Sequence, residues 1–570
     1  MLITRTPRRS THAPTAFGAL TAFGARAVLA ALAVGTLTAA TAVAQQQDLT
    51  LADATARALA RNHDLAIERE AIVSADANIE RARAGYDPVF RAELRYRDQT
   101  IPNNSLLSGA PPGELMPTVR GVISSASLTK FFSSGATITV SSSLARDTSN
   151  NFITLLSPAW TSALGIEARQ PLLQGRANDN VRRGIRVARL SRDRSDIAVR
   201  RAVLETVNAV EQAYWTLVAA RRDVDVRQRN LALAERQRED VASRIEGKVT
   251  PESDIAQPTA EIARRRGDLY AAEETRLRAE RALKQLMLDS PTDPLWDAEL
   301  RPLDAPDALA APVDVQAALR DAEANRPELA DVKVRLAIQD VEIDAARDRL
   351  KPQLDIVGSY TTRGLAGDLN PDAQPFGGIN LVVPPELSGG IGQSIESVFR
   401  HRFPDASIGL QLTVPVGQRA ARADVATAES VKRQAALLQE REAQRIAVEV
   451  RNGATALTTA AQRLEAARAG LDAAQVQLQA EQDRFAAGLT TTFFVLTRQN
   501  DLAAAELAET AALTSYRRAL AEFLRAKGTL LRDRQIVLDA PPASPSSASA
   551  RPAPALSTAA FSSSAARVDR

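Results

Sequence analysis

The stretch that decides the fold reads LTTAAQRLEAARAGLDAAQVQLQAEQDRF, residues 457–485. A large apolar residue recurs at every seventh position of this stretch, and an alanine follows three positions after each of the first three. These residues are Leu457, Leu464, Leu471, Leu478 and Phe485, with Ala460, Ala467 and Ala474. One large and one small residue per heptad is the pattern of a helix that packs against neighbours along its whole length.

The helix predicted around this stretch is very long. The pattern extends it roughly from Arg419 to Ala487, which corresponds to about 100 Å at 1.5 Å per residue. Globular domains rarely contain such a helix, so we expect it to pack in an elongated coiled assembly. An ordinary coiled-coil rod would give the same seam, and this segment alone leaves that alternative open.

The chain is built twice. Residues 60–65, ARNHDL, recur as residues 324–329, ANRPEL, and Pro88 recurs as Pro352 at the same offset. Each half is predicted to contain a helix, a β region, a very long helix, a tight turn and a returning helix. The predicted organisation begins with a signal peptide at 1–44 and ends with a disordered tail at 533–570. The first repeat spans 45–288, with strands at about 88–170 and a helical hairpin at about 180–288. A linker at 289–312 leads to the second repeat at 313–532, with strands at about 353–415 and a hairpin at about 419–532.

The β regions alternate apolar and polar residues. From Phe90 to Arg97 the charged residues fall on one face only. Segments of about ten residues with one apolar and one polar face fit transmembrane strands around a wet lumen. A soluble β-sandwich has the same pattern and is the alternative. A further pair near residues 123–144 is either an extra hairpin or part of a long extracellular excursion, and whether it joins a barrel stays open.

Composition limits the possible functions. Charge is nearly balanced, with 71 Lys and Arg against 68 Asp and Glu among 570 residues. The first 44 residues contain arginines and no acid, so the remainder is close to neutral and offers no basic excess for binding nucleic acid. The chain has no cysteine, which excludes disulfides, thiolate metal sites and a lipidated N-terminal cysteine.

The N-terminal segment predicts secretion. Arginines precede an apolar run at residues 27–40, and Ala42-Val43-Ala44 follows as a small-residue cleavage pattern. The run is short for a spanning helix, so an N-terminal membrane anchor is the weaker alternative. We expect the mature chain to begin at Gln45.

An enzyme is not expected. Outside the N-terminal segment the only histidines are His63 and His401, which lie in different regions without ligand spacing around them. The chain has no nucleophile elbow, P-loop or paired-glycine motif. Neither a cofactor nor a metal is therefore predicted.

In their order, these features resemble the TolC-like family of outer-membrane efflux proteins over about residues 49–531. The motifs that carry the resemblance are Leu49-Thr50-Leu51, Ala84-Gly85-Tyr86-Asp87-Pro88, Gln170-Pro171-Leu172-Leu173 and Arg484-Phe485-Ala486-Ala487-Gly488-Leu489-Thr490-Thr491. The resemblance implies a mostly α protein with membrane β structure. A homotrimer would form a long coiled-coil α-helical barrel and a transmembrane β-barrel of about four strands per chain, 12 in all. The chain would lie in the outer-membrane lipid of a Gram-negative bacterium, with a helical extension in the periplasm.

The function that the resemblance implies is that of a passive exit duct in a tripartite efflux or type I secretion system. Its partners would be a periplasmic adaptor (membrane fusion) protein and an inner-membrane transporter. The alternatives are a periplasmic adaptor, which would have one hairpin flanked by lipoyl-like domains, and a coiled-coil structural protein. The sequence names neither the substrate nor the transporter class, and it does not give the gating mechanism.

The family's helical tips dock the adaptor, and the matching positions lie at two turns of this chain. They are Arg244, Gly247, Val249 and Thr250 at the first turn, and Arg484, Gly488, Leu489 and Thr490 at the second. The glycines are expected at positive φ, where a helix reverses without strain. The alternative is that all these residues merely build a turn.

Residues just past the tips are candidates for an entrance constriction. Some family members place an acidic ring after the second tip, but Phe493-Phe494-Val495 stands there in this chain. The candidates are therefore Asp254 and Phe494. Pro258, inside the first returning helix, is expected to kink it.

Overall fold

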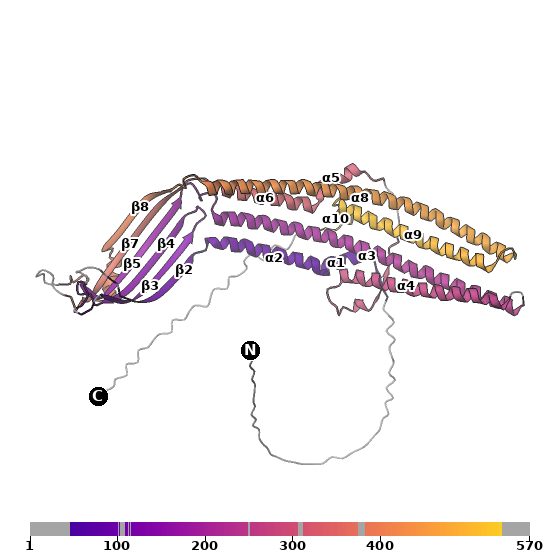
Figure 1. Cartoon of the computed structure of the whole chain (residues 1–570), viewed down its shortest axis with the longest axis horizontal. Coiled ribbons are helices and arrows are strands. Elements are labelled where there is room, and N and C mark those ends of the chain that lie inside the picture. The colour runs from indigo at the N-terminus through magenta and orange to yellow at the C-terminus, as the bar shows by residue number, and fades with distance from the viewer. Residues whose placement is uncertain are drawn as a thin grey trace, which may run out of the picture. The chain divides into compact units, whose positions relative to one another are not determined.

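The computed structural model describes residues 46–537, apart from 101, 103–108, 112, 115, 249–250, 306–311 and 374–381. All the described elements belong to the second of two units, Gln46–Arg570. The predicted signal peptide at 1–44 and the tail beyond residue 537 lie outside the described residues. Within this unit the six strands of the main sheet gather at one end of the long helices and the two helical turns lie at the other end (Figure 1).

Two long helical hairpins dominate the unit. The first joins α3 (Asn180–Glu246) to α4 (Ala256–Met287), and the second joins α8 (Arg419–Ala486) to α9 (Thr492–Ala526). The 68 residues of α8 correspond to about 100 Å. The heptad seam of α8 is confirmed, because Leu457, Ala460, Leu464 and Leu478 are buried and the other seam residues, Ala467, Leu471, Ala474 and Phe485, are half-buried.

Shorter helix pairs open each repeat. The pair α1 (Leu51–Arg61) and α2 (His63–Arg83) corresponds to α5 (Val315–Asn325) and α6 (Pro327–Asp348). The side chain of Thr50 caps α1 by accepting from the amide of Asp53 at 3.1 Å, and Asp314 caps α5 in the same way. The remaining small elements are β1 (Gln46–Leu49), which pairs in parallel with β6 (Glu299–Pro302), α10 (Leu530–Asp533), and the 3₁₀ turns η1 (Ala84–Tyr86), η2 (Glu252–Ile255) and η3 (Pro294–Trp296).

The main sheet is antiparallel throughout, in the order β2-β3-β4-β5-β7-β8. Its strands are β2 (Val89–Thr100), β3 (Thr118–Phe131), β4 (Thr137–Ser149), β5 (Leu156–Pro171), β7 (Gln353–Leu369) and β8 (Phe403–Thr413). The expectation of about four strands per chain is wrong for this sheet, which has six among the described residues.

The additional strands are the pair that the sequence left open near residues 123–144. They form the hairpin β3–β4, which lies between β2 and β5 and pairs with both. Its turn is Ser133-Ser134-Gly135, in which Gly135 has a φ of +84°. A residue without a Cβ adopts this left-handed conformation without strain.

The two faces of the sheet differ in polarity. The register places Phe90 opposite Leu128, Leu128 opposite Val140, and Val140 opposite Ile166, so these apolar side chains share one face. The charged residues of β2, from Arg91 to Arg97, lie on the other face.

Among the described residues, no helix is both long and apolar enough to cross a membrane.

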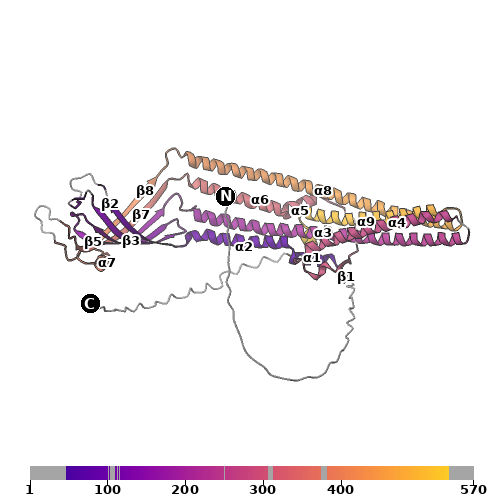
Figure 2. The same cartoon turned by 60° about the horizontal axis from the view of Figure 1, so that its bottom comes forward.

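A short helix, α7 (Ile391–Phe399), packs on the apolar face near the strand ends that lie farthest from the long helices (Figure 2). The hydroxyls of Ser162 and Ser394 are 2.7 Å apart, and the hydroxyl of Thr362 donates to the carbonyl of Val398 at 3.0 Å. Gly364 permits this approach, since a Cβ there would collide with the carbonyl oxygen of Ser394.

Candidate functional site

The first tip closes α3 differently from the prediction. Gly247 is the C-cap of α3 with a φ of −72°, and Lys248 takes the left-handed conformation with a φ of 58°. The expectation that Gly247 needs positive φ is therefore wrong. The hydrogen bond from the Lys248 amide to the Ile245 carbonyl, at 2.9 Å, places the left-handed residue one position later. Val249 and Thr250 lie outside the described residues.

The second tip matches the prediction for its glycine, since Gly488 has a φ of +72°. The Leu489 amide donates to the Arg484 carbonyl at 3.0 Å and the Gly488 amide donates to the Phe485 carbonyl at 3.1 Å. These two bonds form a Schellman motif, which satisfies the last carbonyls of α8. The Leu489 side chain does not fold back onto the helix and stays 79% exposed.

Polar contacts fix the remaining residues of the second tip. The hydroxyl of Thr490 donates to the carboxylate of Glu481 at 2.6 Å, and Arg484 lies 3.5 Å from the same carboxylate. Arg484 nevertheless keeps 65% of its side chain exposed. The second tip therefore offers an apolar and a cationic side chain to a partner.

The two tips of one chain lie against each other. The guanidinium of Arg244, in the last turn of α3, stands 4.4 Å from the centre of the Phe485 ring in α8. This cation–π contact joins the two hairpins at their ends. The structure thus brings together the two turns that the sequence could relate only by their repeat.

The candidate constriction residues lie just past the tips. Asp254 is exposed within η2, and Phe494 lies in the first turn of α9, where its ring contacts that of Phe493 edge-on at 5.5 Å between centres. The expectation that Pro258 lies in the interior of the first returning helix is wrong. Helix α4 begins at Ala256, so Pro258 occupies the first turn, where its missing N–H costs no hydrogen bond.

A buried arginine ties the two hairpins together between the tips and the middle of the helices. Arg265 of α4 donates to the Asn230 carbonyl of α3 at 2.6 Å, to the Asn500 side chain of α9 at 2.8 Å and to Glu261 at 2.7 Å. Its side chain is only 3% exposed. Hydrogen bonds from Arg264 lower the pKa of Glu261 to about 2. Burial acts in the opposite direction, and hydrogen bonds from Arg265 and Asn500 add to the lowering. We call these contacts of Arg265 and Glu261 the hairpin clasp.

The hairpin clasp was not predicted from the sequence. Arg265 stands in a run of three arginines, which is typical of a solvated helix face. The available signal is its spacing, because Ile262, Arg265, Leu269 and Ala272 are all buried and follow one another at intervals of three and four. A charged residue on such a seam must find partners in the interior.

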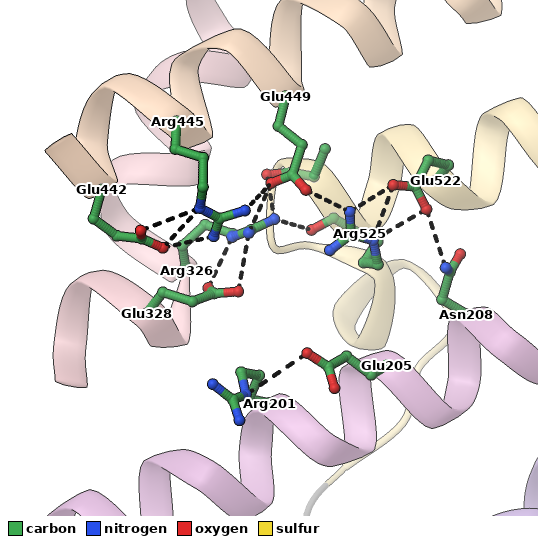
Figure 3. A network of polar contacts seen from close by, with 11 residues as sticks. Arg201, Glu205, Asn208, Arg326, Glu328, Glu442, Arg445, Glu449, Glu522 and Arg525 are labelled. Atoms are coloured by element: carbon green, nitrogen blue, oxygen red, sulfur yellow. Dashed lines mark hydrogen bonds and ion pairs between the residues drawn. The ribbon is translucent and has the colours of Figure 1, made fainter.

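A second ionic network joins the start of α6 to α8 and α9 (Figure 3). The fully buried side chain of Arg326 lies 2.9 Å from both Glu328 and Glu449, and Glu449 lies 2.8 Å from Arg525. Burial would raise the pKa of Glu449, but the hydrogen bond from Arg525 and the charge of Arg326 outweigh it and lower this pKa. Asn208 of α3 extends the network by donating to Glu522 at 3.0 Å. The network thereby links α3, α6, α8 and α9 to one another at the same position along their length.

The described residues contain no group of three or more His, Asp or Glu side chains placed to hold a metal ion. The polar contacts at the tips and in the networks are ion pairs and caps between helices. They hold helices and surfaces in place.

Three solved structures show what the fold is similar to. A membrane protein from Pseudomonas aeruginosa matches with 20% identity and a TM-score of 0.59, covering 84% of this chain and 92% of that chain. The CmeC outer membrane channel of Campylobacter jejuni matches with 15% identity and a TM-score of 0.59, covering 84% and 86%. The open state of the MtrE outer membrane channel of Neisseria gonorrhoeae matches with 18% identity and a TM-score of 0.55, covering 84% and 89%. None of the curated proteins compared with the chain matches it in sequence.

The fold defines a class: the chain shares its architecture with the outer-membrane channels CmeC and MtrE. Residues 318–529, most of the second repeat, match the family model of the outer membrane efflux protein. The predicted resemblance to the TolC-like outer-membrane efflux proteins is thereby confirmed.

Proposed function

We propose that the chain is one subunit of a passive exit duct in the outer membrane of a Gram-negative bacterium. The duct carries substrate delivered by an inner-membrane transporter through a periplasmic adaptor, as in a tripartite efflux or type I secretion system. The observation that carries the proposal is a sheet with one apolar and one polar face, continued by two long helical hairpins that end in exposed tips.

The sheet calls for further copies of the chain. Both faces of its edge strands β2 and β8 are almost entirely exposed, and each edge has a row of backbone groups without a strand partner among the described residues. Open edges are not tolerated in lipid, and six strands are fewer than the eight of the smallest membrane barrels. Closure by a homotrimer, as the family resemblance implies, satisfies both edges.

Exposed apolar residues on the helices support the same assembly. Val448 and Val476 of α8 are 55% and 69% exposed, and Ile67 and Val73 of α2 are similarly exposed. They lie outside the seams that pack within the chain. Side-by-side packing of helices from neighbouring copies would bury them and close a helical tunnel.

The tips supply the adaptor-docking surface of the proposal. Leu489 is an exposed apolar residue at the end of the molecule, flanked by the exposed cation of Arg484. An apolar anchor with a charged rim is the usual chemistry of a protein–protein hot spot. We also propose that Asp254 and Phe494 narrow the periplasmic entrance of the duct.

The test is to express the chain with its N-terminal segment, isolate the outer membrane and reconstitute the purified protein. The expected result is a detergent-requiring trimer that conducts ions across a planar bilayer and hydrolyses no ATP. A monomer that stays soluble without detergent would instead favour an adaptor or a structural rod.

A further inference from the structure

The hairpin β3–β4 is an integral part of the main sheet, since each of its strands pairs with a neighbouring strand of that sheet. Twelve residues of β2 pair with β3 without interruption, from Val89 opposite Thr129 to Thr100 opposite Thr118. The other edge of the hairpin pairs from Thr137 opposite Arg169 to Asp147 opposite Ala159. A flap folded over a finished sheet would not interrupt the contact between β2 and β5 in this way.

The hairpin has the same two faces as its neighbours. Val122 and Leu128 of β3, with Val140 and Leu144 of β4, continue the apolar face of the sheet. The opposite face of the hairpin is formed mostly of small hydroxyl side chains, Ser125, Ser127, Thr129, Thr139, Ser141 and Ser143. The apolar side chains occupy the middle of their face, whose ends carry Arg120, Lys130 and Arg146, and the hydroxyl-rich face also includes Ile123 and Phe131. The middle of each strand therefore presents one side suited to lipid and one suited mainly to water.

The polar face of the hairpin is almost free of charge. Asp147 is its one ionisable side chain, and it is paired with Arg97 of β2 at 2.9 Å. The corresponding face of β2 is charged from Arg91 to Arg97. The hairpin thus adds a smooth, hydroxyl-lined wall beside a charged one.

The two edges of the sheet are compatible with closure by identical copies. Because every neighbouring pair is antiparallel and the sheet has six strands, β2 and β8 run in opposite directions. The β8 edge of one copy can therefore pair with the β2 edge of the next as an ordinary antiparallel ladder. An even strand number per copy closes a ring without any parallel junction.

We propose that three copies close an 18-stranded barrel, so that the exit pore is wider than the 12-stranded barrel expected from the sequence and admits bulky hydrophilic cargo. The trimer in this inference rests on the proposed function. At equal strand spacing and tilt, barrel diameter grows about in proportion to strand number, so the diameter increases by about half and the cross-section about doubles. Barrels of 16–18 strands leave an aqueous channel.

The width and the lining together define the cargo. A hydroxyl-rich wall whose one ionisable side chain, Asp147, is already paired offers hydrogen bonds to a hydrated solute with little charge to hold it. The hairpin would therefore ease the exit of a solute with a large polar cross-section, whereas a small solute would pass a 12-stranded pore equally well.

The test compares the full chain with a variant in which residues 101–155 are replaced by a short turn. This deletion joins β2 directly to β5, and the two strands remain antiparallel, so a four-stranded chain can still close a barrel. Neutral polyethylene glycols of graded size are added to one side of a planar bilayer containing the trimer, and the largest polymer that enters the pore is measured. From the loop side, the full chain should admit polymers with a radius larger by about half. From the tip side, the two proteins should behave alike, because their helices are identical.

A second measurement does not depend on the deletion variant. The chain has no cysteine, so single cysteines can be placed in the hairpin without background. A membrane-impermeant thiol reagent should label Ser125→Cys and Ser143→Cys in reconstituted trimers, and it should not label Val122→Cys or Val140→Cys.

The outcomes separate this inference from the proposed function. Equal polymer limits on the loop side, or equal labelling of all four cysteines, would overturn the 18-stranded wall while the duct itself stands. A protein that forms no conducting trimer would overturn the duct and the barrel with it.

Discussion

Replacing Arg265 by Met should loosen the hairpin clasp while leaving the rest of the fold in place. Methionine has a similar length but no charge, so the substitution removes three hydrogen bonds and leaves the carbonyl of Asn230 and the side-chain oxygen of Asn500 without this donor. Glu261 would keep its ion pair with Arg264 at 2.5 Å. The perturbation is therefore confined to the place where α3, α4 and α9 meet.

The expected magnitude follows from burial and from the pKa of Glu261. Removing one partner of a buried ion pair costs about 3–5 kcal/mol. The pKa of Glu261 falls from 4.5 to about 2, which corresponds to about 3 kcal/mol shared among all its partners. Since Arg264 retains part of that stabilisation, we expect a local loss of about 3 kcal/mol in total.

Hydrogen exchange of the purified protein measures this loss where it occurs. A change of about 3 kcal/mol in local opening accelerates exchange about a hundredfold, and it should appear in peptides around residues 230, 262 and 500. The matched control is Arg266→Met. Arg266 is about half exposed and pairs with Glu235 at 3.2 Å, so its loss should cost less than about 1 kcal/mol. Equal exchange in the two variants would refute the hairpin clasp.

The same clasp predicts a dependence on acid. The folded-state pKa of Glu261 lies below its ordinary value, so its stabilisation is fully present above about pH 4.5 and is lost as the pH falls towards about 2. Exchange near residue 262, corrected for the intrinsic pH effect, should accelerate over that range. In Arg265→Met the acceleration should be smaller and should level off at a higher pH, because a weaker partner set lowers the pKa of Glu261 less.

Three further changes test other parts of the molecule. Gly488→Val should cost about 1–2 kcal/mol at its positive φ and reduce cross-linking to the adaptor while the trimer persists on native gels, whereas Gly247→Val, at negative φ, should disturb its tip less. Leu489→Asp should abolish efflux without backbone strain, and unchanged efflux would show that this residue only closes a turn. Gly364→Val should push α7 off the sheet by colliding with the Ser394 carbonyl, so limited proteolysis should cut residues 382–402 faster than in the unchanged protein.

The parts of the fold that could be predicted are those set by local periodicity. The heptad seam from Leu457 to Phe485 specified one long helix, and the structure gives α8 as Arg419–Ala486. The alternation of each strand likewise identified its apolar face. Period 2 says which way a side chain points but not which strand lies alongside, so the place of β3–β4 between β2 and β5 could not be derived from the pattern.

The tips show a similar boundary between what is local and what is not. A glycine near a helix end indicates a reversal, but the left-handed position can fall on any of several neighbouring residues. At the first tip it falls on Lys248. The contact of Arg244 with Phe485 depends on how the two hairpins pack, and nothing in either turn specifies it.

These differences make the two tips of each chain chemically distinct. The first tip carries charges of both signs, with Arg244 held over the Phe485 ring and Lys248 in a strained left-handed conformation. The second relies on an unstrained glycine and presents Leu489 to solvent. In the proposed trimer, six tips would alternate between these two kinds around the entrance. An adaptor that binds this ring of six tips would contact an apolar Leu489 side chain at every second tip. Its binding should therefore be more sensitive to changes at Leu489 than to changes at Gly247.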